Sequence, residues 1–440
     1  MVSIDIVAIV LLLAALIGAV NDRCVRLPAP IGMLLGSLVV VLVIVVADRV
    51  LRLHIMQPIR RGLAAADLPH VFLGWLLALL LFAGSLQVDL PALRQSRRMI
   101  FVLATVGVIL SAAVFGFGLW TLLALTGREV SLAWCFVLGA ILAPTDAVVV
   151  ETLLGRTRLP VPTRSAIIGE SLFNDGAGVV LFLVALRLTE GAPAGQLIGH
   201  GRLAIAMSEQ LAGGAAVGFL SGLLAAWTIH RVADDAVRII VSLALVVGCY
   251  RLAIVCHVSG PIAAVSAGLL LGRTLHRGGE REETGVAASE PDPILEFWSL
   301  LSRVLNLGLF LGIGAEVMAL VVTWWQLATA AATVPIALVA RMVSVAVPLA
   351  GSGRPVRTVA RQTAVLTWAG MRGGISIALA LTLPAFRYRT ELLVICYAVV
   401  LFSIVVLGLT LPGLLRRLYA DEVGAAVGAE SVTRVSGSSG

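Results

Sequence analysis

The sequence predicts an all-α polytopic membrane protein with about 13 transmembrane helices, arranged as an inverted repeat with two broken helices that cross. Three observations support this fold class. The 440 residues are 59% hydrophobic, with a mean hydropathy of +1.03. Only 13% are charged, about half the share found in soluble domains and too few to cover a soluble fold of this length. Two apolar runs are also interrupted by proline or glycine beside a charged residue, at matching places in the two halves of the chain.

A spanning helix needs ~20 mostly apolar residues, and the chain contains thirteen runs of that order. They start near Ile4, Pro28, Val71, Phe101, Leu132, Arg164, Leu203, Ala236, Cys256, Phe297, Trp324, Val359 and Glu391. No basic residue precedes the run Ile4–Val20, whereas a secretory signal peptide begins with a basic segment. We therefore expect this run to be retained as the first helix.

The arginines between the runs predict the orientation of the chain. All 32 basic residues are arginine. With the N-terminus outside, eighteen arginines fall in loops after odd-numbered helices and ten in the opposite loops. The positive-inside rule then places the N-terminus outside and the C-terminus in the cytoplasm. Because the arginines lie in short loops, we assign the net charge of +7 to contact with lipid headgroups of the bilayer and not to nucleic acid.

The sequence shows no sign of a cofactor, a resident metal site or an enzyme. The five cysteines mostly lie in or beside apolar runs, and no pair has the CxxC spacing, so no disulfide framework is expected. Neither GxSxG nor HExxH occurs in the chain.

Ionisable residues at membrane depth are costly and mark functional sites. Five of them lie inside apolar runs: Asp146, Glu170, Asp175, Arg341 and Arg372. Three acids thus face two bases, so at least one acid is expected to lack a basic partner.

Two of these acids lie in the stretch GESLFNDG, residues 169–176. An α-helix turns by about 100° per residue, so side chains four apart share a face. Ser171 and Asp175 form one row, and Glu170 and Asn174 form another. The first row offers the oxygen ligands that hard monovalent cations prefer. The spacing therefore predicts two polar faces that belong to separate sites.

The two rows suggest different roles for their acids. Arg341 is a candidate partner for Glu170, and we favour a buried ion pair there that only fixes helix packing. Asp175 is left without a base. A buried carboxylate of this kind can take up and release a proton near neutral pH.

Both predicted breaks combine a helix-breaking residue with a charge. In LAPTDAVVV, Pro144 lacks a backbone donor, so the helix should break near Ala143–Asp146. The freed carbonyls and Thr145 could then bind a cation, with Asp146 near the N-terminus of the second half-helix. The alternative is a simple proline kink capped by Asp146.

The second break is expected in WAGMRGGISIAL, where glycines flank Arg372. An inverted repeat around the seventh helix would relate the two breaks and direct Arg372 toward Asp146 at the crossing. The alternative is a tight packing site with a snorkelling arginine.

Four motifs in this order resemble the cation/proton antiporter 1 family, the bacterial NhaP-type sodium/proton antiporters. They are APTDAVVV, GESLFNDGAGVVLF, ALVARMVSV and GMRGGISIALALTLP. The resemblance implies an NhaA/NhaP-like fold and a homodimer in the bacterial cytoplasmic membrane. It also implies a division into dimerisation-domain helices at 1–97, core helices at 98–190, a linker helix and further dimerisation helices at 200–325, core helices at 326–418 and a cytoplasmic tail at 419–440.

Residue by residue, the resemblance implies that Asp175 binds the ion and the proton. Thr145 and Ser171 match Na⁺ ligand positions. Asn174 matches the Asn before the binding Asp, Asp146 matches the Asp of the broken fifth helix, and the resemblance includes both among the ion- and proton-binding residues. Glu170 matches the acid that pairs with an arginine on the eleventh helix, here Arg341.

The implied function is exchange of a monovalent cation, Na⁺ first, for H⁺. Asn174 stands where electrogenic relatives have a second Asp, which implies electroneutral exchange. Ala83 stands where many relatives carry a Glu on the third helix, and this departure leaves the ion preference open. A K⁺/H⁺ antiporter and a cation channel remain as alternatives, although no carbonyl filter or pore-lining repeat is visible.

Overall fold

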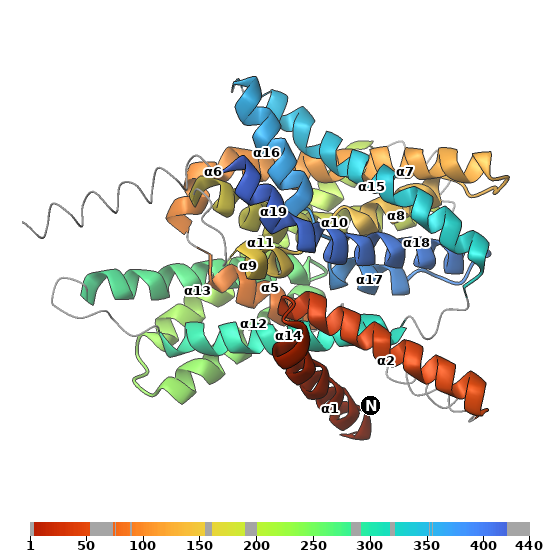
Figure 1. Ribbon diagram of the computed structural model, residues 1–440. Helices are drawn as coiled ribbons and strands as arrows, with labels where there is room; N and C mark the ends of the chain where they lie inside the picture. The colour runs from red at the N-terminus through yellow and green to blue at the C-terminus, as the bar shows by residue number, and fades with distance from the viewer. Residues whose placement is uncertain are drawn as a thin grey trace, which may run out of the picture.

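Helices are the only regular secondary structure in the described part of the computed structural model, which confirms the all-α prediction (Figure 1). The structure describes residues 4–52, 74, 76–88, 90–154, 161–189, 200–282, 292–316, 322–351, 353 and 355–419. The predicted tail lies outside these residues from position 420 onward.

The first half of the chain contains α1 (Ile4–Val20), η1 (Asn21–Val25), α2 (Ala29–Leu51), α5 (Leu77–Leu86), α6 (Leu90–Val102), η3 (Leu103–Gly107), α7 (Val108–Leu125), α8 (Leu132–Leu142), α9 (Ala147–Leu154) and α10 (Val161–Thr189). The second half contains α11 (His200–Ile229), α12 (Asp235–Val255), α13 (Gly260–Glu282), α14 (Pro293–Glu316), α15 (Trp324–Ala350), α16 (Val356–Ala369), α17 (Gly374–Leu381), α18 (Arg389–Phe402), η5 (Ser403–Leu407) and α19 (Gly408–Leu418). The η segments are single π-helical turns, and η3 and η5 each lie within a longer continuous helix.

Eight described helices are long and apolar enough to cross a membrane, or nine if the bent pair α16–α17 forms one span. The protein is therefore a multi-pass membrane protein, but these criteria do not confirm the predicted number of thirteen. Helices α5 and α8 are too short alone, with 10 and 11 residues. The run that starts at Leu132 is divided between α8 and α9, and the start of the run near Val71 lies outside the described residues.

Local signals explain where some helices begin. Asp234 caps α12 by accepting a 3.0 Å hydrogen bond from the Val237 N–H. At the start of α15, the Gln326 side chain accepts a 2.9 Å hydrogen bond from the Thr323 N–H.

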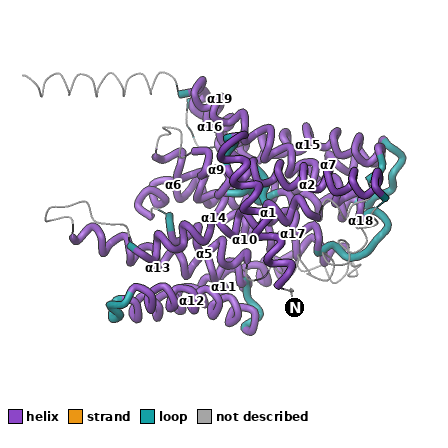
Figure 2. The backbone as a smooth tube through the Cα atoms, turned by 60° about the horizontal axis from the view of Figure 1, so that its bottom comes forward, coloured by secondary structure: helices purple, strands orange, loops and turns teal. Residues whose placement is uncertain are grey.

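The helices pack around two main clusters of buried apolar side chains. The larger cluster draws most of its members from α7–α10 and α15–α19, and the smaller one from α5 and α11–α14. Figure 2 shows α11, α12 and α13 gathered at one side of the bundle, away from α15 and α16. Helices α11 and α13 approach closely because Gly218 meets the backbone of Ala263, the small-residue packing common between membrane helices.

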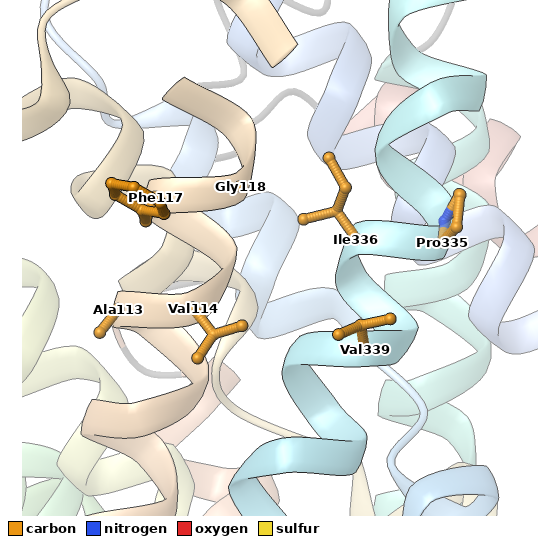
Figure 3. Close-up of a pocket in the computed structure, with 7 residues that line it drawn as sticks. All are labelled: Ala113, Val114, Phe117, Gly118, Pro335, Ile336 and Val339. Atoms are coloured by element: carbon orange, nitrogen blue, oxygen red, sulfur yellow. The ribbon is translucent and has the colours of Figure 1, made fainter. Parts of the chain in front are cut away.

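An apolar groove of about 570 Å³ lies between α7 and α15 (Figure 3). Its lining residues are Ala113, Val114, Phe117, Gly118, Pro335, Ile336 and Val339. Phe117 and Val339 are exposed on the surface of two helices that qualify as membrane spans. The groove therefore faces hydrocarbon and offers no ligand to an ion.

Candidate ion-binding site

Both predicted helix breaks are present. Helix α8 ends at Leu142 and α9 begins at Ala147, with Pro144 in the non-helical segment between them. Helix α16 ends at Ala369 and α17 begins at Gly374, and their axes differ by 56°. In each case the sequence supplies the cause, which is a proline without an N–H group or a cluster of glycines.

The two breaks lie against each other. The N–H group of Asp146 donates a 2.8 Å hydrogen bond to the carbonyl oxygen of Met371. A Cβ atom on Gly373 would collide with the Asp146 carboxylate, so glycine is what allows this approach. The broken helices therefore cross, and their contact is made by backbone atoms of both breaks.

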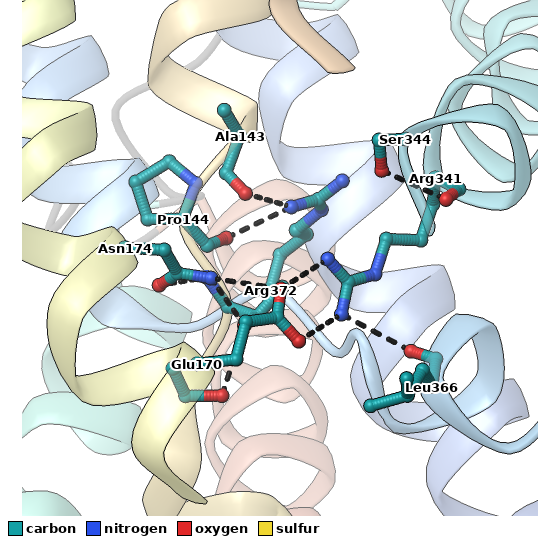
Figure 4. Close-up of polar contacts among 10 residues, drawn as sticks. Ala143, Pro144, Glu170, Asn174, Arg341, Ser344, Leu366 and Arg372 are labelled. Atoms are coloured by element: carbon teal, nitrogen blue, oxygen red, sulfur yellow. Dashed lines mark hydrogen bonds and ion pairs between the residues drawn. The ribbon is translucent and has the colours of Figure 1, made fainter. Parts of the chain in front are cut away.

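Arg372 points into the first break, as Figure 4 shows. Its Nη1 donates to the carbonyl oxygens of Ala143 and of Pro144, the latter at 3.0 Å. These carbonyls follow the C-terminal end of α8, where the helix dipole is negative. The prediction directed Arg372 toward Asp146, whereas the structure places its guanidinium on the carbonyls two and three positions earlier.

The other half-helix ends also meet charges of the favourable sign. Nη2 of Arg341 donates a 3.1 Å hydrogen bond to the Leu366 carbonyl, in the last turn of α16. Asp146 accepts a 3.3 Å hydrogen bond from the Val149 N–H at the start of α9, and its carboxylate lies beside Gly373 at the start of α17. Positive charges thus face the two C-terminal ends and a negative charge faces the two N-terminal ends.

Glu170 and Arg341 form a buried ion pair (Figure 4). The pair is bidentate, with Nη1 bonded to Oε1 and Nη2 at 2.8 Å from Oε2. Glu170 is 1% exposed and Arg341 is 6% exposed. A pair with this geometry joins α10 to α15 and restricts the orientation of both side chains.

Thr145 connects the two polar rows that the helical period separated. Its hydroxyl lies 2.9 Å from the Ser171 hydroxyl and accepts a 2.8 Å hydrogen bond from Asn174 Nδ2. Asn174 Oδ1 accepts a bond from the Thr145 N–H at 3.2 Å, and Nδ2 also lies 3.4 Å from Glu170 Oε1. The two predicted polar rows are therefore not isolated from each other, because Thr145 in the first break contacts side chains of both; the separate roles of Glu170 and Asp175 stay a prediction.

Asp175 differs from Glu170 in its partners. Its side chain is buried, at 6% exposure. Among the residues that the structure describes, none donates a hydrogen bond to this carboxylate or forms an ion pair with it. Both buried arginines are directed elsewhere, to Glu170, to Leu366 and to the first break. The Asp175 carboxylate is therefore buried without a bonded partner among the described residues, unlike that of Glu170.

Asp175 also lies where α10, which contributes to the larger apolar cluster, contacts α5 and α13, which contribute to the smaller one. Leu172, three positions earlier, belongs to a small apolar cluster with Leu77 of α5 and Val265 of α13. Gly176, the residue after Asp175, faces the tip of Ile262 on α13. Positions 172 and 176 lie on the same side of position 175, about 60° and 100° around the helix axis, so the carboxylate lies at the edge of an apolar contact between α10, α5 and α13.

Sequence reasoning missed two groups at this site. The Leu366 carbonyl belongs to the backbone, so the identity of this residue gives no indication that it accepts a hydrogen bond from Arg341. Ser403 accepts a 3.0 Å hydrogen bond from the Arg372 N–H, and its position inside the apolar stretch LFSIVV could have identified it. The departure at Ala83 is seen as a fully buried methyl group in the smaller apolar cluster.

Residues 9–417 match the family described as sodium/hydrogen exchanger, transmembrane. The chain is 34% identical over 429 residues to the Na⁺/H⁺ antiporter NhaP of Pseudomonas aeruginosa, covering 95% of this chain and 98% of that protein. It is 31% identical to the Na⁺/H⁺ antiporter NhaH of Halobacillus dabanensis, over 78% of this chain and 81% of that one.

Among solved structures, the fold is similar to that of the sodium proton antiporter MjNhaP1 from Methanocaldococcus jannaschii. The TM-score is 0.71 at 20% identity, and the alignment covers 94% of this chain and 98% of MjNhaP1. On the extent of these matches, the chain belongs to the cation/proton antiporter 1 family of membrane transporters, the sodium/hydrogen exchangers, and to its NhaP type.

Proposed function

We propose that the protein exchanges one Na⁺ for one H⁺ across the cytoplasmic membrane, and that both ions compete for Asp175. The observation that supports this proposal is the difference between the two acids of α10. Glu170 is neutralised by Arg341, while Asp175 is equally enclosed but has no bonded partner among the described residues. In this assignment Ser171 and Thr145 supply further oxygens to Na⁺, and Asn174 and Asp146 complete the ion- and proton-binding site.

Competition at one carboxylate is sufficient to couple the two fluxes. An ionised carboxylate moved through an apolar contact would cost on the order of several kcal/mol in lost hydration. A bound proton or a bound Na⁺ each removes the negative charge. The helices that carry Asp175 therefore move past α5 and α13 only when one of the two ions is bound, and exchange follows.

We also propose that the chain is divided into a core unit and a second unit that forms the dimer contact. The core would comprise residues 98–190 and 326–418, and the helices of 1–97 and 200–325 would form the other unit and the contact of a homodimer. The N-terminus would lie outside and the C-terminus in the cytoplasm, as the arginine distribution indicates. Because Asn174 is neutral, the exchange would be electroneutral.

The test is ion-driven proton flux in everted membrane vesicles with a fluorescent pH dye. Addition of Na⁺ should restore the fluorescence for the wild type and leave it unchanged for Asp175→Asn. Asn174→Ala serves as the matched control, since it removes a neighbouring polar side chain without removing the titratable group, and it should retain measurable exchange. Normal Na⁺-dependent flux in Asp175→Asn would refute competition at this residue.

The same assay separates the alternatives. Parallel additions of Na⁺, Li⁺ and K⁺ determine the cation, and a response to K⁺ alone would establish a K⁺/H⁺ antiporter. Clamping the membrane potential with valinomycin should leave electroneutral exchange unchanged. A cation channel would instead give fluxes that follow the potential.

A further inference from the structure

A small cavity of about 20 Å³ lies beside the ion pair, between α15, the second break and the helical segments α18 and η5. Its polar lining consists of Arg341, Thr367, Arg372 and Ser403, and the rest of its wall is apolar side chains and Gly370. A buried water requires about 10–15 Å³ and two to four polar partners. The size and the lining both match one water molecule.

Two polar atoms at this cavity have no partner among the described residues. They are Nε of Arg341 and Oγ1 of Thr367, and both are buried. Arg341 directs Nη1 and Nη2 to Glu170 and to the Leu366 carbonyl, so its Nε–H still needs an acceptor. A buried donor without an acceptor is rare in folded proteins because it loses its hydration without compensation.

We infer that this cavity is a binding site for one water molecule, which bridges Arg341 Nε and the Thr367 hydroxyl. A water oxygen has two lone pairs for guanidinium N–H groups and two hydrogens for hydroxyl oxygens, so it suits a lining of two arginines and two hydroxyls. Chloride fits less well for two reasons. It is larger than water, and it adds a negative charge where three carboxylates already face two guanidinium groups.

The water positions Arg341. With Nε bonded, each of the three guanidinium nitrogens has a hydrogen-bond partner, and the plane of the group is held for the bidentate contact with Glu170. The same water ties α15 to Thr367, one residue beyond the carbonyl that Arg341 already contacts on α16. This site is independent of the ion that the protein carries, and its test therefore does not use transport.

The first test compares Thr367→Val with Thr367→Ser in thermal unfolding of the detergent-purified protein. If the Thr367 hydroxyl had no partner, its replacement by the isosteric valine would leave the melting temperature unchanged or raise it. With the water bound in the wild type, Thr367→Val removes one of its few polar partners, so the water is held less firmly and Arg341 Nε loses its acceptor when the water leaves. The melting temperature should then fall by a few degrees. Thr367→Ser retains the hydroxyl and should restore most of the loss.

Thr333→Val is the matched control for this substitution. Thr333 is also buried, but its hydroxyl donates to the Ala330 carbonyl on its own helix. That carbonyl keeps its helical partner, so a smaller change is expected there than at Thr367. An equal or higher melting temperature for Thr367→Val than for the wild type would overturn the inference.

The second test is a crystal structure at high resolution, which remains decisive if Thr367→Val does not fold. Density should appear within about 2.7–3.2 Å of both Arg341 Nε and Thr367 Oγ1. Crystals grown in bromide should give no anomalous peak at this position. An anomalous peak would assign the cavity to an anion, and an absence of density would show that the cavity is dry, so either result would refute the water site.

Discussion

Two carboxylates five positions apart on α10 differ in their basic partners, and this difference separates their roles. Arg341 binds Glu170 through two hydrogen bonds, one of them at 2.8 Å. Asp175 has no such bond to any described residue. The buried ion pair of Glu170 fixes the relative positions of α10 and α15. A buried carboxylate without a basic partner, such as that of Asp175, is free to bind an ion.

This difference predicts opposite effects of substitution. Glu170→Gln leaves Arg341 buried without a counter-charge and should lower the free energy of unfolding by about 3–5 kcal/mol. Asp175→Asn should leave that free energy nearly unchanged or raise it, because it removes an uncompensated charge. Thermal unfolding of both variants in detergent checks the pair. Equal melting temperatures for Glu170→Gln and the wild type, with loss of ion binding alone, would reverse the assignment.

At the residue scale, the sequence was informative about side chains that share a helix. The row of Glu170 and Asn174 follows from the helical period, and the 3.4 Å contact between these side chains agrees with it. The helical period says nothing about partners from other segments of the chain. Thr145 therefore connects two rows of side chains that the helical period had separated. The bonds from Arg372 go to backbone carbonyls, which no side chain in the sequence indicates.

At the scale of the element, the broken helices depend on a few residues that the sequence identifies. Pro144 and the glycines around Arg372 mark both breaks within a residue or two, because their backbone chemistry acts locally. The sequence does not say how closely the two breaks approach each other. The hydrogen bond from the Asp146 N–H to the Met371 carbonyl and the lack of a Cβ on Gly373 determine this distance.

Gly373→Ala tests this crossing. The backbone of Gly373 is extended, with φ −118° and ψ −163°, so alanine can adopt it and only the collision with Asp146 opposes the change. We expect stability to fall by about 1–3 kcal/mol and Na⁺/H⁺ exchange to fall with it. Thermal unfolding and the vesicle assay measure the two effects.

Gly248→Ala is the control for Gly373→Ala. Gly248 lies on an exposed face of α12, and a Cβ there would meet no atom within 4 Å. Alanine should raise stability slightly, by about 0.5–1 kcal/mol, because it restricts the unfolded chain. If both variants behave alike, the crossing does not depend on the space beside Asp146.

At the scale of the whole molecule, the proposed movement takes place where α10 contacts α5 and α13. Two glycine contacts near this boundary differ in the atoms that they involve. Gly218 of α11 meets the backbone of Ala263 on α13, whereas Gly176 of α10 meets the flexible end of the Ile262 side chain. The first contact is rigid, and the second can adjust when one surface slides over the other.

Matched alanine substitutions at these two glycines distinguish a fixed boundary from a moving one. Gly218→Ala presses on backbone atoms that cannot shift, so it should lower stability by about 1–3 kcal/mol while the folded fraction still exchanges ions. Gly176→Ala displaces only the tip of Ile262 and should change stability by less than about 1 kcal/mol. It should nevertheless slow exchange, since the added methyl group must pass Ile262 whenever α10 moves against α13. Turnover in proteoliposomes, corrected for folded protein, measures the rate. Wild-type turnover in Gly176→Ala would show that α10 and α13 stay in fixed contact, and the movement would then have to occur at another boundary.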